Sequence, residues 1–157
     1  MATPDPPGRP RSGPPSRGGG GTRRASVETG TVWEAMAGYA RAVRVGDRIL
    51  VSGTTATGPD GPVAPGDAAA QARFVLDRIE RAIETLGGRL RDVVRTRVYV
   101  SRLEDWEVVA RVHGERFGTI RPANTLVQAG LVGTPYLVEI EAEAVIGAGD
   151  ALQSSAE

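Results

Sequence analysis

Two stretches near the end of the chain decide the fold: Ile120-Arg121-Pro122-Ala123-Asn124-Thr125-Leu126-Val127 and Tyr136-Leu137-Val138-Glu139-Ile140-Glu141-Ala142-Glu143-Ala144-Val145. The second stretch alternates strictly between small or apolar residues (Val138, Ile140, Ala142, Ala144) and glutamates (Glu139, Glu141, Glu143). A period of two is typical of a β-strand that buries one face and keeps the other polar. The stretches therefore predict two strands, joined by a short connection that contains glycine and proline.

Three further strands are expected upstream. Tyr39 to Val45 and Arg48 to Ser52 are separated by a tight turn at Gly46-Asp47, which predicts a hairpin. Val93 to Val100 is rich in β-branched residues and is expected to be a strand of the same sheet.

Two helices are expected between these strands. Apolar residues recur at helical spacing from about Ala68 to Leu86, after the N-cap residue Asp67 and before the stop signal Gly87-Gly88. A second helix is expected from about Glu104 to Arg116, with an apolar stripe of Trp106, Val109, Ala110, His113 and Phe117. The order ββαβαββ predicts an α+β fold, in which a mixed sheet carries both helices on one face.

The composition divides the chain of 157 residues into one domain and two tails. Residues 1–26 are rich in proline, glycine and arginine, so we expect a disordered tail there; the domain is expected over 27–147, and a C-terminal tail over 148–157. Residues 1–24 contain five arginines and one aspartate, about +4, which leaves about −4 for the remainder of a chain whose net charge is zero. An acidic domain favours no nucleic-acid partner, and the absence of a long apolar run predicts a cytoplasmic protein without a membrane partner.

Missing residue types exclude several chemistries. The chain has no cysteine, and all 19 of its basic residues are arginine. A thiol nucleophile, a cysteine-ligated metal and a lysine Schiff base are therefore excluded. With His113 as its single histidine, a site with several histidine ligands is excluded too.

The terminal strands, together with Gly38-Tyr39-Ala40-Arg41-Ala42-Val43 and Val51-Ser52-Gly53-Thr54, resemble the RidA (reactive intermediate deaminase, YjgF) family over residues 30 to 146. The resemblance implies a chorismate-mutase-like (YjgF-like) fold and a homotrimer, whose active-site clefts lie between neighbouring chains. A trimer would also cover the sheet face that the helices leave open, where apolar residues are expected. The reaction implied is hydrolytic deamination of a small imine or enamine, with neither metal nor cofactor.

Glu139 is the expected catalytic residue. Its position matches the family glutamate that positions or activates the attacking water. A partly buried carboxylate has a pKa nearer neutrality, which suits an acid/base. Periodicity alone instead favours a solvated face of three glutamates, and that remains the expectation for Glu141 and Glu143.

Asn124 stands where the family normally has an arginine that binds the substrate carboxylate. Replacing that arginine by a neutral amide should cost about 2–4 kcal/mol of binding, on the scale of charged hydrogen bonds. A neutral imine, amide, aldehyde or ketone then becomes a more plausible substrate than a 2-imino acid. The other interpretation is that Asn124 only satisfies local backbone groups.

The remaining candidates line the cleft or supply charge. Tyr39, Ser52, Gly53 and the backbone of Leu126 match family elements that contact the ligand. Arg41, Arg97 or Arg121 could replace the missing cation, although a surface or inter-chain ion pair is the expected role of each. Trp33 is either a lid over the cleft or a packing residue, and His113 is expected in the core or the cleft wall.

Three functions follow from these residues. The first is a RidA-like enzyme that acts on a small imine, enamine or carbonyl intermediate, by hydrolysis or by tautomerisation or cyclisation in a biosynthetic pathway. The second is a non-catalytic trimer that binds a small ligand. A ribonuclease is the least favoured, because the domain is acidic and lacks a histidine pair.

Overall fold

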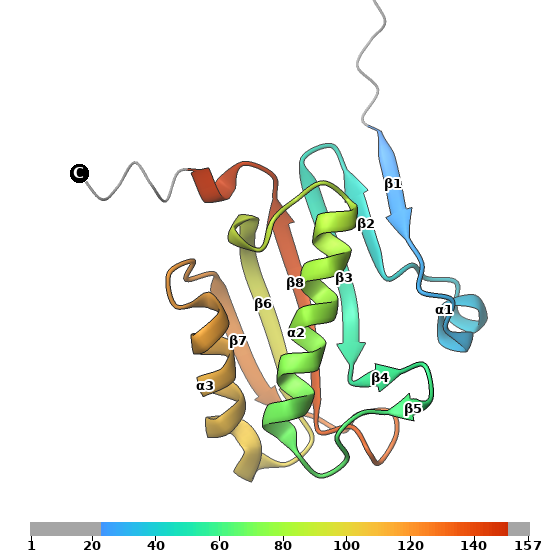
Figure 1. Cartoon of the computed structure of the whole chain (residues 1–157), viewed down its shortest axis with the longest axis vertical. Coiled ribbons are helices and arrows are strands. Elements are labelled where there is room, and N and C mark those ends of the chain that lie inside the picture. The colour runs from blue at the N-terminus through green and yellow to red at the C-terminus, as the bar shows by residue number, and fades with distance from the viewer. Residues whose placement is uncertain (1–22, 151–157) are drawn as a thin grey trace, which may run out of the picture.

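The structure, a computed structural model, describes residues 23–150. A mixed sheet of six strands, in the order β1-β2-β3-β8-β6-β7, forms one layer, and two long helices form the other (Figure 1). The strands of this sheet are β1 (Arg24–Val27), β2 (Ala42–Val45), β3 (Arg48–Thr55), β6 (Val93–Val100), β7 (Ala123–Gln128) and β8 (Val138–Val145). The α+β fold expected from the sequence is confirmed.

Local sequence explains the central connections of the sheet. β2 and β3 form the expected hairpin, in which Gly46 takes a φ of 65° that an L-residue rarely adopts. β8 lies between β3 and β6 and is antiparallel to both, whereas β7 is parallel to β6 because helix α3 carries the chain back across the sheet. β7 therefore forms one edge of the sheet, and β1 forms the other.

The two long helices pack on the same face of the sheet. α2 (Ala68–Thr85) begins after Asp67, whose carboxylate accepts the Ala70 N–H, and the chain leaves it through Gly87 at a φ of 84°. α3 (Trp106–Phe117) follows a single 3₁₀ turn, η2 (Leu103–Asp105). The expected stripe is wrong at Trp106, which is 49% exposed, because the buried side of α3 begins one turn later, at Val109.

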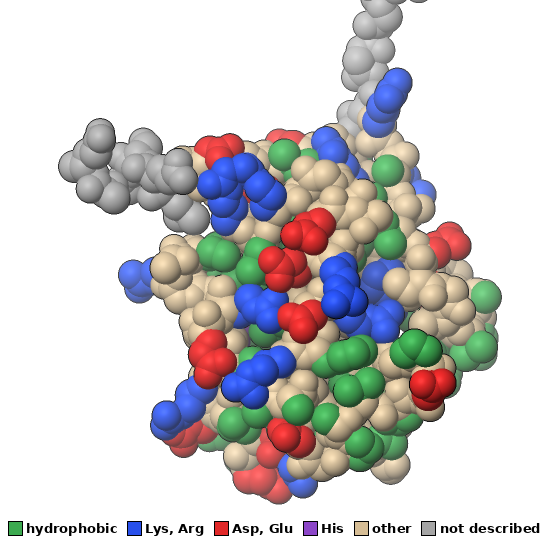
Figure 2. Space-filling view, in the orientation of Figure 1, with side chains coloured by type: hydrophobic (Ala, Val, Ile, Leu, Met, Phe, Trp, Pro, Cys, Tyr) green, Lys and Arg blue, Asp and Glu red, His purple; other side chains and the backbone are tan. Residues whose placement is uncertain are grey.

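The core lies between the helices and the inward side of the sheet. Alternation in β8 buries Val138, Ile140, Ala142 and Ala144 there, as expected, and α2 supplies Val75, Leu76, Ile79 and Ile83. The outer side of the helices is charged, and acidic and basic side chains are interspersed over it (Figure 2). Arg116 pairs there with Asp77 and Glu80, which joins α3 to α2.

The folded part is longer than expected at both ends. β1 begins at Arg24 and pairs with β2, so residues 24–26, assigned to the tail, belong to the sheet. A 3₁₀ turn, η3 (Ala148–Asp150), packs near a second 3₁₀ turn, η1 (Leu90–Asp92), and extends the domain beyond 147. Residues 1–22 and 151–157 lie outside the described part of the chain.

Two small elements flank the C-terminal half of β3 and had not been expected. A short helix, α1 (Val32–Ala37), follows β1, and a two-stranded ribbon of β4 (Thr57–Gly58) and β5 (Gly61–Pro62) follows β3. β2 pairs only with the Arg48–Val51 half of β3. The Ser52–Thr55 half therefore has no strand beside it on that edge, and this opening determines where the site lies.

Candidate functional site

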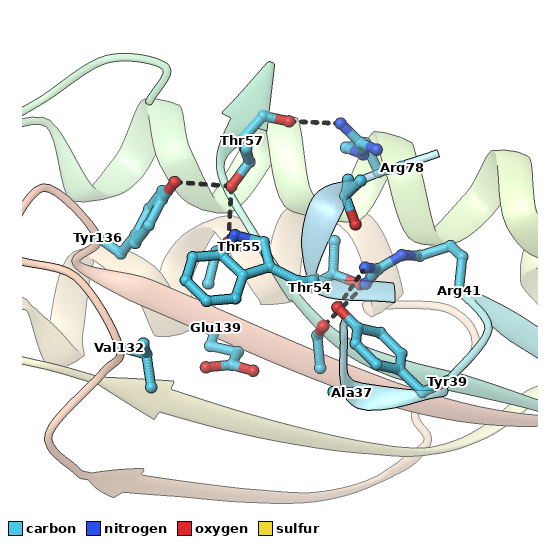
Figure 3. Close-up of a pocket in the computed structure, with 13 residues that line it drawn as sticks. Ala37, Tyr39, Arg41, Thr54, Thr55, Thr57, Arg78, Val132, Tyr136 and Glu139 are labelled. Carbon is cyan, nitrogen blue, oxygen red and sulfur yellow. Dashed lines mark hydrogen bonds between the residues drawn. The ribbon is translucent and has the colours of Figure 1, made fainter. Parts of the chain in front are cut away.

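A cavity of about 230 Å³ lies beside the unpaired half of β3 (Figure 3). Its walls come from α1, β3, α2, β8 and the loop that precedes β8. The residues that line it are Thr31, Trp33, Ala37, Tyr39, Arg41, Gly53, Thr54, Thr55, Thr57, Arg78, Val132, Tyr136 and Glu139. Four of the predicted site residues, Tyr39, Arg41, Gly53 and Glu139, are therefore brought together.

Gly53 makes room for the Glu139 carboxylate. The register between β3 and β8 shifts by one residue between Val51 and Thr54, so a β-bulge lies at Ser52-Gly53. A Cβ atom on Gly53 would lie 2.2 Å from Glu139 Oε1, closer than non-bonded atoms approach. The glycine is thus a steric requirement for this position of the carboxylate.

The surroundings of Glu139 favour its protonated form. Burial raises the pKa of this carboxyl, and the negative charge of Glu141, two residues along the strand, raises it further. The positive charge of Arg41 opposes both effects but does not reverse them. A carboxyl group with a raised pKa can accept and return a proton closer to neutral pH.

Arg41 is buried, and protein groups accept hydrogen bonds from both of its Nη atoms, whereas its Nε has no hydrogen-bond partner among the described residues. Its Nη1 donates to Gly53 O at 2.8 Å and to Thr54 Oγ1 at 2.9 Å. Its Nε lies 3.5 Å from Glu34 Oε1, and its Nη2 lies 3.4 Å from the Tyr39 hydroxyl. The expected surface or inter-chain ion pair is therefore wrong for Arg41, which pairs within the chain and supports the cavity wall.

Glu34, the partner of Arg41, is held by α1. Burial by itself raises the pKa of Glu34, but hydrogen bonds from the Thr29 hydroxyl and the backbone N–H groups of Thr29 and Gly30, together with Arg41, lower it overall. The ionised carboxylate thus neutralises the buried guanidinium. No sequence pattern marked this pair, because its members belong to separate elements.

Hydroxyl groups form a second wall of the cavity. Thr57 Oγ1 donates to the Tyr136 hydroxyl at 2.9 Å and lies 2.9 Å from Thr55 Oγ1 (Figure 3). Arg78 Nη1 donates to the Thr57 carbonyl in the same region. These residues had not been singled out from the sequence. The stretch Ser52-Gly53-Thr54 is the only sequence signal that pointed toward this wall.

The other predicted ligand contacts lie elsewhere. Ser52 donates its hydroxyl to Ala40 O at 2.8 Å and does not line the cavity. Asn124 and Leu126 are on β7, separated from β3 by β8 and β6. Asn124 Oδ1 accepts the Thr96 hydroxyl at 3.1 Å, on the helix side of the sheet, and Leu126 packs against the core.

His113 contacts the same Thr96 hydroxyl as Asn124 and lies beside the core. Its Nε2 lies 2.8 Å from Thr96 Oγ1, its ring packs against Phe117, and burial lowers its pKa. Since the Thr96 hydroxyl donates to Asn124, it accepts from His113, which places the proton of the neutral ring on Nε2.

The two remaining candidate cations lie outside the cavity. Arg97 Nη1 pairs with Glu141 at 2.6 Å and with Glu143 at 3.3 Å, on the open face of the sheet, as expected for a surface ion pair. Arg121 borders a different hollow, beside Arg91 and Val93. Within residues 23–150, no three His, Asp or Glu side chains gather as a metal-binding group, and no helix is both long and apolar enough to cross a bilayer.

Comparison with known proteins identifies the fold family. Residues 29–146 match the family model described as endoribonuclease L-PSP. An uncharacterized protein of Streptomyces coelicolor is 39% identical over 125 residues, which cover 79% of this chain and 93% of that protein. A RutC family protein of Pyrococcus abyssi is 34% identical over 105 residues, covering 66% and 83%.

Solved structures give the same result. A Mycobacterium tuberculosis member of the YjgF/YER057c/UK114 family superposes with a TM-score of 0.72 at 43% identity, covering 79% of this chain and 100% of that one. The YjgF gene product of Escherichia coli gives 0.63 at 31% identity, covering 77% and 92%. The chain belongs to the YjgF/RidA family.

Proposed function

We propose that the protein is an enzyme that acts on a small imine, enamine or carbonyl intermediate, with Glu139 as its acid/base. The observation that carries the proposal is the environment of the Glu139 carboxyl. This carboxyl lies at the cavity, Gly53 leaves room for it, and its pKa is raised. Membership of the YjgF/RidA family supports a role in binding or processing a small molecule.

Hydrolytic deamination would need only this carboxyl and one water. Glu139 would take a proton from the water as its oxygen adds to the C=N carbon, and would pass this proton to the nitrogen to give a carbinolamine. The carboxylate would then take the proton of the carbinolamine hydroxyl and deliver it to the nitrogen, which leaves as ammonia while the C=O bond forms. Tautomerisation or ring closure would use the same proton transfer without the water.

We further propose that the site is completed by a neighbouring chain of a homotrimer. Asn124 and Leu126 lie on the far edge strand of the sheet, so a second chain would have to bring its own copies to the cavity. Large apolar side chains at or near the cavity mouth support an interface there: Trp33 is 47% exposed, Met36 72% and Val132 78%.

Replacing Glu139 by glutamine tests the proposal. Glu139→Gln keeps the shape of the side chain and removes its proton chemistry, so turnover of an imine substrate should fall by about 10²-fold or more. Glu143→Gln is the matched control, because Glu143 lies on the same strand and pairs with Arg97 instead of lining the cavity. Equal small losses in both variants would show that the glutamates form only a polar strand face.

A non-catalytic ligand-binding protein is the second candidate. It is favoured by the engagement of Asn124 Oδ1 with Thr96, because this amide oxygen is directed at the protein's own hydroxyl. A protein that binds small carbonyl compounds equally well as wild type and as Glu139→Gln, but turns over no imine, would fit this function.

Ribonuclease activity, which the name of the matching family model suggests, is less favoured than either. His113, the single histidine of the chain, is packed against Phe117 and bonded to Thr96 on the helix side of the sheet, away from Glu139. It therefore cannot pair with Glu139 as a second proton-transfer group in the cavity.

A further inference from the structure

Arg78 introduces an unbalanced positive charge into the cavity. Its side chain is half-buried on α2, and its Nη1 donates to the Thr57 carbonyl. Within the described part of the chain, no carboxylate lies within 4.0 Å of its guanidinium. Its guanidinium also lies 5.8 Å from the centre of the Phe74 ring, which supports its position but neutralises nothing.

Arg41 differs from Arg78 in this respect. Glu34 neutralises Arg41, whose donors are directed at Gly53, Thr54 and Tyr39. For Arg78, burial lowers the pKa, and the nearby charges of Arg41 and Arg81 lower it further, while Glu34 partly offsets them. The burial of this charge is therefore costly, and an anion beside Arg78 would relieve that cost.

The free edge of Arg78 suits a carboxylate. Among the described residues, only Nη1 of this guanidinium has a hydrogen-bond acceptor, so the edge formed by Nε and Nη2 is unengaged. That edge carries two parallel N–H groups, which bind both oxygens of a carboxylate at once.

Arg78 and Glu139 lie at opposite ends of the cavity. Glu139 belongs to the open face of the sheet and Arg78 to a helix on the other face, and the cavity passes along the unpaired edge of β3 between them (Figure 3). Thr55 pairs with Glu139, and Thr57, which accepts from Arg78, is two residues further on. This path corresponds to a separation on the order of 10 Å between the Arg78 guanidinium and the Glu139 carboxyl.

We propose that Arg78 binds a carboxylate of the substrate, and that several bonds separate this carboxylate from the C=N or C=O group at Glu139. The inference rests on the proposed function and gives it a substrate class: an oxo or imino acid whose acid group is remote from the reacting carbon. A 2-imino acid carries its carboxylate on the adjacent carbon, and so it cannot reach both ends of the cavity.

Isothermal titration calorimetry with two isomeric ketoacids distinguishes a remote carboxylate from an adjacent one. 5-Oxohexanoate and 2-oxohexanoate have the same composition and charge, and differ only in the distance between carbonyl and carboxylate. Wild type should bind 5-oxohexanoate at least about 10-fold more tightly than 2-oxohexanoate, and more tightly than the neutral 5-oxohexanamide by a similar factor.

The variant Arg78→Gln should lose this preference. Its affinity for 5-oxohexanoate should fall by about 10- to 100-fold, the range for a charged bidentate contact, while its affinity for 5-oxohexanamide stays the same. A general loss of structure would weaken both ligands. Arg81→Gln is the matched control, because Arg81 is on the same helix but does not line the cavity. Arg81 lines a neighbouring hollow beside Phe74 and Thr85, which Arg41 and Arg78 also border.

The outcomes distinguish this inference from the proposed function. Equal affinities for the two isomers, no measurable binding of 5-oxohexanoate, or no effect of Arg78→Gln would overturn the inference even if imine turnover depends on Glu139. An equal loss in Arg81→Gln would place the anion in the neighbouring hollow and would overturn it too. The remaining outcome is that Glu139→Gln still prefers the charged ligand while wild type turns over no imine. That result would support carboxylate binding by Arg78 and would contradict the proposed enzymatic function.

Discussion

The space beside Glu139 exists because residue 53 has no side chain. The Glu139 carboxylate occupies the volume that a Cβ atom on Gly53 would need, and the bulge in β3 directs that position at the carboxylate. At this scale a single methyl group can reposition the Glu139 carboxylate without disturbing the core.

The substitution Gly53→Ala should displace the Glu139 carboxylate and leave the fold intact. The alanine Cβ would force the flexible Glu139 side chain aside, and a shift of about 1 Å can cost about 10²-fold in turnover. Gly114→Ala is the control: nothing lies within 4 Å of its Cβ, and it should stabilise α3 by about 0.5–1 kcal/mol. Imine turnover and thermal unfolding would be measured for both variants, and full activity in Gly53→Ala would mean that the carboxylate position is not critical.

The charge of Glu141 should be visible in the pH dependence of turnover. Because Glu141 raises the pKa of Glu139, Glu141→Gln should lower that pKa. If Glu139 must be ionised to take a proton from water, activity is lost as the pH falls through its pKa, so the acid limb of kcat/KM should move to lower pH. Glu143→Gln should leave the limb in place, and a limb that responds to neither variant would have another origin.

Several of these residues could be predicted from the sequence, but their partners could not. The alternation of the last strand places Glu139 opposite the core, and Tyr39 and Gly53 follow from the family resemblance. The pairing of Arg41 with Glu34, and the position of Arg78 in the cavity wall, depend on how α1, β3 and α2 pack together. A pattern within one element contains no information about such contacts.

At the scale of elements, short segments held by tertiary contacts were the hardest to predict. α2 and β8 are long and periodic, so their sequences predicted them well. β1 has four residues and α1 has six, and neither has enough length for a period to show. β1 forms because the edge of β2 is available for pairing, and α1 is fixed by its Thr31 cap and by Glu34.

Asp92 holds the C-terminal turn to the start of β6. It is fully buried, and it accepts N–H groups of Arg89, Gly147 and Gly149 at 2.9 to 3.2 Å. Burial by itself raises the pKa of Asp92, but the hydrogen bonds from Gly149 and Arg89 and the charge of the Arg89 guanidinium lower it overall. The ionised carboxylate therefore stabilises the fold, and its bonds to Gly147 and Gly149 help to extend the domain past residue 147.

Asp92→Asn should lower the free energy of unfolding by about 1.5–3 kcal/mol at pH 7, the range for hydrogen bonds to a charged group. A lowered folded pKa means that the stabilisation is present above the unfolded value and is lost as the pH falls through the folded value. The difference between wild type and variant should thus shrink below about pH 4. Asp150→Asn removes an exposed ion pair with Arg89 and Arg91 and should cost less than about 1 kcal/mol. Urea unfolding at several pH values measures both, and a constant difference between wild type and Asp92→Asn would contradict the role of the charge.

At the scale of the whole molecule, one sheet face remains uncovered. The helices cover the other face, while the open one carries Val45, Leu50 and Val127, each 38–43% exposed, around the Arg97 ion pairs with Glu141 and Glu143. Apolar side chains that surround satisfied charges are typical of a surface that packs against another chain. This face therefore supports the proposal that neighbouring chains of a trimer pack here and bring Asn124 and Leu126 of one chain to the cavity of the next.

Light scattering after size exclusion should therefore give about 49 kDa, three times the chain mass of 16.4 kDa. Leu50→Glu would place a carboxylate opposite Glu143 on the open face, so it should shift the mass toward 16.4 kDa and abolish turnover with it. Val108→Glu is the matched control, since Val108 is 39% exposed and lies on helix α3, on the opposite side of the sheet; it should remain a trimer. A wild-type monomer that still turns over an imine would show that residues of one chain complete the site. In that case Asn124 and Leu126 would have no part in it, because β8 and β6 separate them from the cavity of their own chain.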